Sequence, residues 1–137
     1  MRKIICVVIA LLFTLIVHSF IDTPIFKGES DKITLYLGNS SSACQMATID
    51  VKDYYKYTGV CGESVVVQKQ GFNLTSLLKK YGASVIFSEQ IAEGENYYCY
   101  SPKLKYRRVL NGKIINLHVF VGESSVSMGS PMIFGSF

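Results

Sequence analysis

Three cations spaced at every second position give this chain its clearest chemical pattern. Lys103, Lys105 and Arg107 would share one face of an extended segment. Pairing across a turn at Asn111-Gly112 would bring His118 to the same face. Clustered cations attract anions such as phospholipid head groups, anionic polymers or an acidic protein surface. We therefore predict a basic binding face of Lys103, Lys105, Arg107 and His118; the alternative is that they only form the polar side of a half-exposed sheet.

The dipeptide Asn111-Gly112 predicts how this basic segment pairs with the next one. Asn-Gly between two apolar runs is typical of a two-residue type I′ hairpin turn. In such a turn Leu110 lies opposite Lys113, and the same register continued backwards places Lys105 opposite His118. A slip of one residue would move every side chain to the other face, so the register tests the predicted basic face.

Glu89, Glu93 and Glu95 flank another predicted turn and are the only carboxylate group that suggests catalysis. Paired carboxylates can act as acid and base in glycoside hydrolysis, so a small secreted hydrolase using this 89–95 turn is the alternative function. An exposed hairpin tip explains the same residues more simply. G-x-S-x-G, H-E-x-x-H and P-loop motifs are absent, and His118 is the only histidine after residue 19. We expect a non-enzymatic binding domain with no cofactor.

The cysteines bear on the redox state of the domain. Cys44 and Cys61 are separated by a short polar stretch, so they are the candidate disulfide in an oxidising compartment. The alternative is that Cys44, Cys61 and Cys99 all stay free thiols. No pair has the C-x₂₋₄-C spacing of structural zinc sites, and we predict no metal site.

The N-terminus reads as an export segment. Met1-Arg2-Lys3 precedes an apolar run over residues 4–17, which is the pattern of a signal peptide. Val17-His18-Ser19 offers a cleavage site before Phe20, whereas an uncleaved segment would anchor the chain with the domain outside. We expect an extracytoplasmic protein, secreted or anchored to the cell membrane.

These features predict the organisation of the chain and its partners. Residues 1–19 are the signal peptide or anchor, 20–32 a linker, and 33–137 a single domain. Without Arg2 and Lys3 the formal charge falls from +4 to +2, which gives no reason to expect nucleic-acid binding. The expected partner is a cell-envelope protein or an anionic surface polymer, together with the membrane if the N-terminal segment stays attached.

The periodicity predicts an α+β fold. Asn73 as N-cap and Gly82 as stop frame an amphipathic helix over 74–81. Short connections between the strands require antiparallel neighbours, so we expect a curved antiparallel sheet with one or two helices on one face. Residues 43–58 can be written either as a strand or as a helix and stay unassigned, and the apolar tail 128–137 should dock on the domain. The predicted strands are 33–37, 64–70, 84–91, 96–101, 104–110, 113–121 and 125–128.

Three short motifs follow one another in the C-terminal half: Tyr100-Ser-Pro-Lys103, Asn111-Gly-Lys113 and Gly129-Ser-Pro-Met-Ile-Phe-Gly-Ser136. This series resembles the end of the YwmB-like proteins of spore-forming Gram-positive bacteria, over residues 64–137. The resemblance implies an exported protein whose fold is similar to that of the TATA-box-binding protein, with curved antiparallel sheets and helices on one side. It brings no functional residues, and the likeness concerns shape only.

Overall fold

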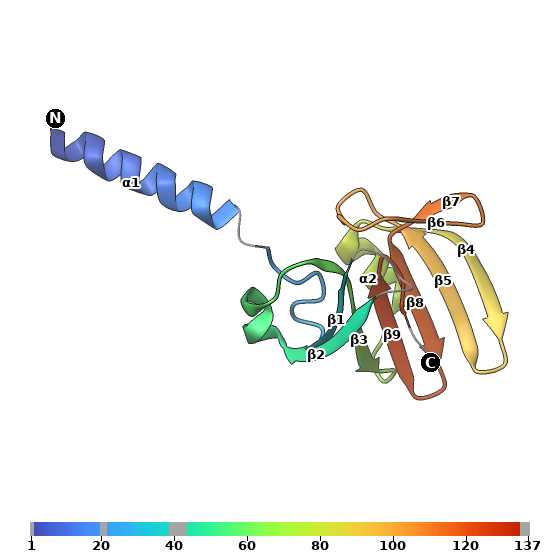
Figure 1. The fold of residues 1–137 in the computed structure, drawn as a ribbon. Coiled ribbons are helices and arrows are strands. Elements are labelled where there is room, and N and C mark those ends of the chain that lie inside the picture. Colours follow the sequence, from blue (N-terminus) through green and yellow to red (C-terminus); the bar gives the residue numbers. More distant parts are fainter. Residues whose placement is uncertain (1, 20–21, 39–43, 135–137) are drawn as a thin grey trace.

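Seven strands form one antiparallel sheet. Figure 1 shows how its strands are arranged. The computed structural model describes residues 2–19, 22–38 and 44–134. The sheet has the order β2-β1-β3-β9-β8-β5-β4, and β6 and β7 pair separately, so the α+β antiparallel prediction is confirmed. The elements are α1 (Arg2–Ser19), β1 (Lys32–Leu37), β2 (Gln45–Asp50), the 3₁₀ helix η1 (Val51–Lys56), β3 (Val60–Gln68), α2 (Leu74–Tyr81), β4 (Ser84–Ile91), β5 (Gly94–Tyr100), β6 (Arg108–Leu110), β7 (Lys113–Ile115), β8 (Leu117–Gly122) and β9 (Ser125–Ser130).

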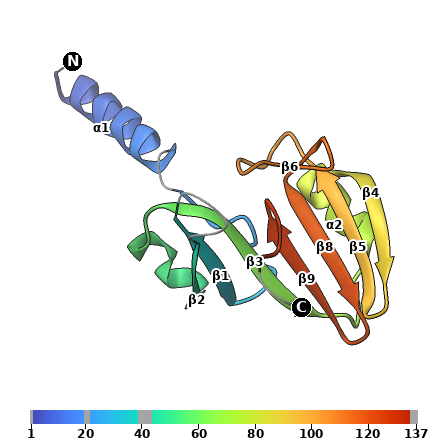
Figure 2. The same ribbon diagram turned by 45° about the vertical axis from the view of Figure 1, so that its right-hand side comes forward.

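The main core lies between the sheet and α2, on the face to which Leu117 and Val119 of β8 point. Alternate residues of every central strand reach this core, as the pleat requires. Leu77 and Tyr81 supply the apolar stripe of α2. Figure 2 shows α2 beside the β4–β5–β8 half of the sheet.

Helix α2 has the predicted bounds because both of its ends carry local signals. The Asn73 side chain accepts a hydrogen bond from the Ser76 amide at 2.8 Å, which satisfies one free donor of the first turn. Gly82 follows the helix in the left-handed conformation, with φ 60°, and its amide bonds back to the last turn.

Residues 22–31, expected as part of a linker, instead pack against the core; we call this segment the strap. Phe26 is 0% exposed, and its ring meets that of Tyr81 edge to face at 5.9 Å. Glu29 accepts a hydrogen bond from the Tyr81 hydroxyl at 3.0 Å and pairs with Lys80. The strap therefore packs with the domain although its composition predicts a linker, because burial of one aromatic ring outweighs the polar residues around it.

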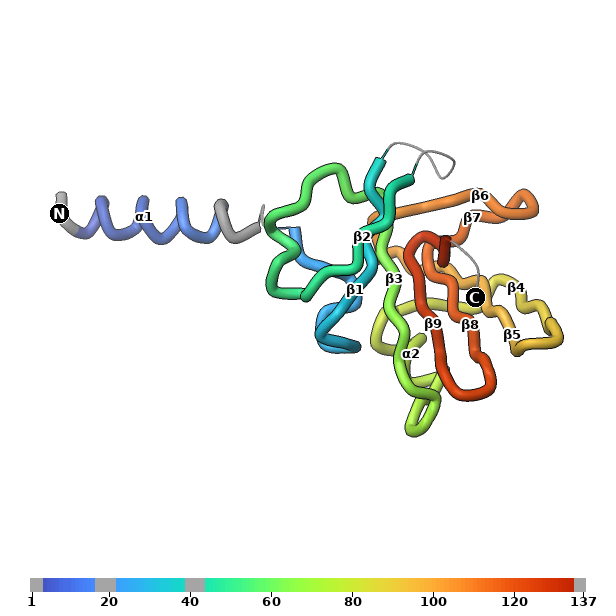
Figure 3. The backbone as a smooth tube through the Cα atoms, turned by 60° about the horizontal axis from the view of Figure 1, so that its bottom comes forward, coloured from blue at the N-terminus to red at the C-terminus, as the bar shows by residue number. Residues whose placement is uncertain are grey.

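The unassigned stretch 43–58 contains both β2 and η1. Strand β2 pairs with β1 from Lys32↔Asp50 to Leu37↔Gln45, and η1 then turns the chain back toward β3. In Figure 3 this unit lies at the end of the sheet nearest the strap. The sequence of this stretch fits both a strand and a helix because it forms a strand followed directly by a 3₁₀ helix.

Two predicted strands of the C-terminal half are wrong in extent. Residues 104–107 are not a strand, and the expected strand 113–121 is divided into β7 and β8 at Asn116. The hairpin register is right where strands exist, with Leu110 opposite Lys113 and Arg108 opposite Ile115. It does not continue, because His118 pairs instead with Tyr98 of β5 and Gly129 of β9.

The C-terminal tail docks as two separate pieces. Strand β9 lies inside the sheet between β3 and β8, and the chain then folds back over the face opposite the main core. The Phe134 amide donates to the Tyr36 hydroxyl at 3.0 Å, and the two rings meet at 4.6 Å. A Cβ on Gly129 would lie 2.6 Å from the Ile133 nitrogen, so only glycine allows this close approach.

Helix α1 exposes apolar side chains on every side. Those from Ile4 to Ile16 are between 48% and 68% exposed, and the helix projects away from the domain in Figure 1. Among the described residues, no helix combines the length and apolar character needed to cross a membrane.

Candidate functional site

The predicted basic residues lie on an irregular loop rather than on a sheet face; we call residues 101–107 the basic loop. Buried Asn116 holds this loop in place. Its side-chain oxygen accepts from the Ser101 amide at 2.7 Å, and its nitrogen donates to the Ser101 and Leu104 carbonyls at 2.6 and 3.2 Å. The backbone amide of Asn116 donates to the Cys99 carbonyl at 3.0 Å and its carbonyl accepts from the Ser130 hydroxyl at 2.7 Å. Both backbone groups that would pair with Arg107 are therefore engaged, so pairing stops at Arg108.

Side chains of the basic loop nevertheless alternate as predicted. Leu104 is buried, whereas Lys103, Lys105 and Arg107 are exposed. Lys105 bonds to Asp22 at 3.0 Å and lies over the ring of Tyr106 at 4.9 Å. The structure therefore brings three of the four predicted binding residues onto one exposed loop.

Arg107 and Lys103 are fixed by neighbouring elements. The guanidinium of Arg107 lies 5.9 Å from the ring centre of Tyr100, a cation–π contact that leaves the charge in water. The stem of Lys103 lies close to Gly82, at the C-terminal end of α2, where a cation is favourable. The loop presents its charges from a defined backbone.

The fourth predicted residue, His118, is not part of this surface. It is buried on the tail-covered face of the sheet, where its Nε2 lies 2.8 Å from Asn96 and its Nδ1 accepts from the Ile133 amide. Its ring stacks on Tyr98 at 4.6 Å. Burial lowers the pKa of His118 to about 4, so it is neutral near pH 7. Its predicted role in the basic face is wrong, because the strand carrying it pairs with β5 and β9.

A buried polar group lies beneath the basic loop and the strap. Glu63 is 0% exposed and accepts from the Phe26 amide at 2.9 Å, while its Oε2 has no hydrogen-bond partner among the described residues. Burial raises the pKa of Glu63, although the backbone amides of Phe26 and Ile25 and the nearby Lys105 act to lower it. Burial is likewise the main cause that raises the pKa of Tyr106 to about 12. The Glu63 carboxylate on β3 therefore interacts with the backbone of the strap and with the charge of Lys105 on the basic loop.

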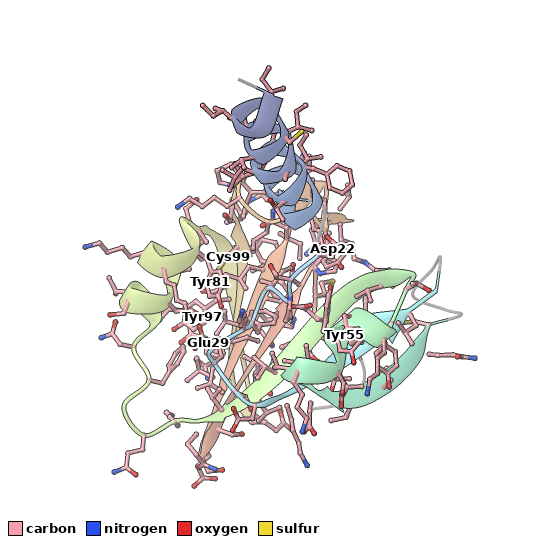
Figure 4. The ribbon with its side chains drawn as sticks, turned by 90° about the vertical axis from the view of Figure 1, so that its left-hand side faces the viewer. Asp22, Glu29, Tyr55, Tyr81, Tyr97 and Cys99 are labelled. Atoms are coloured by element: carbon pink, nitrogen blue, oxygen red, sulfur yellow. The ribbon has the colours of Figure 1, made fainter. Side chains whose placement is uncertain are left out.

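Asp22 lines two neighbouring surface hollows. One, of about 370 Å³, lies between the strap and Lys103–Lys105; the other, of about 410 Å³, lies between Asp22 and the tyrosines around η1. Tyr55 is 74% exposed beside this second hollow, and Figure 4 shows it on the same side of the domain as Asp22. Asp22 follows α1 after only two residues. We call this region, with the basic loop and η1, the junction end.

The candidate disulfide cysteines are close to one another as free thiols. Burial, followed by the neighbouring Cys44 thiol, raises the pKa of Cys61. The Cys61 thiol also donates to the Tyr36 carbonyl at 3.3 Å. Cys99 is buried in the main core, and burial raises its pKa to about 12. The disulfide between Cys44 and Cys61 stays a prediction.

The three glutamates of the hydrolase alternative do not converge. Glu89 pairs with Asn96, which faces the tail side of the sheet, whereas Glu95 accepts from Tyr97 on the core side. Glu93 lies in the turn between β4 and β5. In the described part of the chain, no three histidine, cysteine or acidic side chains gather closely enough to hold a metal ion.

Sequence reasoning missed Asp22, Tyr55 and Glu63. The run Tyr54-Tyr55-Lys56-Tyr57 is a usable signal, because exposed aromatic and basic residues together favour an interface. Glu63 also shares a strand face with Val65 and Val67, so a carboxylate is placed where the pattern demands an apolar residue.

Comparison with known proteins adds no identity: no family model, no curated protein and no solved structure matches the chain. The resemblance to YwmB-like proteins therefore rests on its motifs alone.

Proposed function

We propose that this chain is an exported, non-enzymatic binding domain that acts at the cell envelope and recognises an anionic ligand through the basic loop. The observation that carries this proposal is the presentation of Lys103, Lys105 and Arg107 on a loop fixed from below by Asn116. Fixed cations lose little entropy when an anion binds, so they are more effective than mobile surface lysines. The N-terminal segment serves as signal peptide or anchor and places the domain outside the cell.

The same proposal explains why nucleic acid is not the ligand. An extracytoplasmic domain meets lipid head groups, wall polymers and other envelope proteins rather than cytoplasmic nucleic acid. The hydrolase alternative gains no support from the geometry, since Glu89 and Glu95 lie on opposite faces of the sheet.

Binding of a soluble polyanion tests the proposed function directly. The full chain, held in a neutral detergent, is titrated with inorganic polyphosphate at low salt. Combined Lys103→Glu, Lys105→Glu and Arg107→Glu should weaken binding by about tenfold or more, because each cation near an anionic surface contributes about 1 kcal/mol.

A matched variant controls for net charge. Lys27→Glu, Lys69→Glu and Lys113→Glu change three exposed lysines outside the basic loop by the same total charge. This control should bind polyphosphate nearly as well as the wild-type chain. Equal weakening in both triple variants, or in neither, would overturn the assignment of binding to the basic loop.

A further inference from the structure

We infer that the junction end docks on the anionic head-group layer of a membrane, with the apolar side chains of α1 taken up beside it. This inference rests on the proposed function and identifies its ligand as anionic phospholipid. The surface consists of the basic loop, Asp22 and the exposed part of η1 around Tyr55.

Chain connectivity is the first argument. Ser19 ends α1, and Asp22 already forms an ion pair with the basic loop at 3.0 Å. Three peptide links span at most about 11 Å, so with the Asp22 side chain and the ion pair the Lys105 ammonium lies within about 18 Å of the end of the apolar helix. Any bilayer that takes up the apolar side chains of α1 therefore has its head groups within about 18 Å of the Lys105 ammonium.

The composition of the junction end is the second argument. Tyrosine and cations together are typical of membrane interfaces, where a ring sits among head groups and an ammonium or guanidinium meets phosphate. Tyr55 is exposed with Lys56 lying 5.7 Å from its ring centre, and Lys105 and Tyr106 repeat this arrangement on the loop. Lys52 and Lys56 pair with acidic neighbours, so the excess positive charge comes from the basic loop.

The charge at the opposite end of the sheet is the third argument. Strand β5 runs from the β4–β5 turn to the basic loop. At the turn, one hollow gathers Glu93, Glu95 and Glu123 with Lys69 as its single cation among the described residues, so this end carries a net negative charge. Seven residues of strand cover about 20 Å, which exceeds a Debye length of about 10 Å. A negatively charged surface therefore attracts the domain when the basic loop faces it and repels the domain when the acidic turn faces it. This polarity orients the domain on an extended lipid surface, whereas a small soluble anion offers no surface against which to orient.

Hydrogen exchange of the full chain in vesicles tests the inference. The chain is reconstituted in phosphatidylcholine vesicles and in vesicles that also contain phosphatidylglycerol. Amides of 51–58 and 101–108 should exchange about tenfold more slowly with phosphatidylglycerol present, while those of 89–95 should not change. The Lys103, Lys105 and Arg107 charge-reversal variant should lose this protection, and the Lys27, Lys69 and Lys113 variant should keep it.

The outcomes separate this inference from the proposed function. If charge reversal weakens polyphosphate binding but phosphatidylglycerol protects neither segment, the basic loop binds another anion and lipid docking is overturned. Equal protection in both vesicle types also overturns it, because docking would then not depend on head-group charge. If charge reversal leaves polyphosphate binding unchanged, the proposed function itself is wrong.

Discussion

The two ends of β5 differ in charge and in how their charges are held. At one end the basic loop rests on the buried side chain of Asn116, which bonds three backbone groups. At the other end Glu93 occupies a tight turn before Gly94, where a Cβ would lie 2.2 Å from the Val121 carbonyl. Basic charges are thus positioned by a polar contact inside the protein, whereas the acidic turn depends on a backbone approach that only glycine permits.

Removing the support of the basic loop should have the largest effect. Asn116→Ala leaves the Ser101 amide and the Leu104 carbonyl without the bonds from this side chain, and the Ser101 carbonyl with only its 3.5 Å bond from the Leu104 amide, so we expect a loss of about 4 kcal/mol in unfolding free energy. The matched change at the acidic end is Gln90→Ala, which removes an exposed side-chain bond to Gly94 and should cost less than about 0.5 kcal/mol. Urea denaturation of both variants measures the contrast; equal losses would show that Asn116 is not the special support.

Acid sensitivity should arise at His118, which lies near the middle of the sheet. Its pKa falls from an ordinary 6.5 to about 4 on folding, so the neutral form stabilises the domain. That stability is present above pH 6.5 and is lost as the pH falls through about 4, by roughly 3 kcal/mol in total. His118→Gln should flatten this part of the stability profile in urea titrations between pH 7 and pH 4. An unchanged slope would assign the acid sensitivity to other groups.

Oxidation should stabilise the domain. A disulfide between Cys44 and Cys61 closes a short loop and should add about 3 kcal/mol if its geometry is unstrained. Oxidised glutathione supplies the oxidant, and the product loses two hydrogens, which intact-mass measurement detects. Cys99→Ser should still oxidise, whereas Cys61→Ser should not. A linkage that instead includes Cys99 would contradict the pairing, because Cys99 is buried in the core.

Local signals account for the parts of the fold that the sequence predicts well. Helix α2 is predicted to the residue because Asn73 and Gly82 act within one turn of its ends. The three β6–β7 pairs follow from Asn111-Gly112 alone. Such elements do not depend on contacts with distant parts of the chain, so their sequence pattern is sufficient.

Long-range contacts explain what the sequence could not predict. Alternating charge at Lys103, Lys105 and Arg107 is the same for a strand and for an extended loop, and only the contacts of Asn116 decide between them. The three cations are exposed, as the alternation predicts. The prediction is wrong for His118, because the strand that carries this residue pairs with β5 and not with the segment of the three cations. The composition of residues 22–31 predicts a linker. The burial of Phe26 depends on contacts with distant parts of the chain, so no local pattern indicates it.

Neutralising Glu63 should have a smaller, pH-dependent effect. Glu63→Gln keeps an acceptor for the Phe26 amide and removes the buried carboxyl whose ionisation burial disfavours, so we expect a gain of about 1 to 2 kcal/mol once the pH is above the raised pKa of Glu63. Folding raises the pKa of Glu63. The stability of the wild-type chain is therefore highest below the ordinary pKa of a glutamate and falls as the pH rises through the raised pKa. The difference between the two chains should therefore vanish in acid. A constant difference at all pH values would contradict a buried charge as its cause.

The smallest effect on stability should come from Asp22→Asn, the change that most sharply tests the contrast in charge between the two ends. Asp22 is 78% exposed on its side chain and Lys105 is 42% exposed, so their ion pair should contribute less than about 0.5 kcal/mol. Removing the carboxylate frees Lys105 and makes the junction end more positive. Affinity for phosphatidylglycerol vesicles should then rise a few-fold at low salt. Glu93→Gln adds the same charge at the acidic end, beyond one Debye length, and should leave the affinity nearly unchanged. Equal gains from both substitutions would mean that net charge, rather than the position of the basic loop, governs binding.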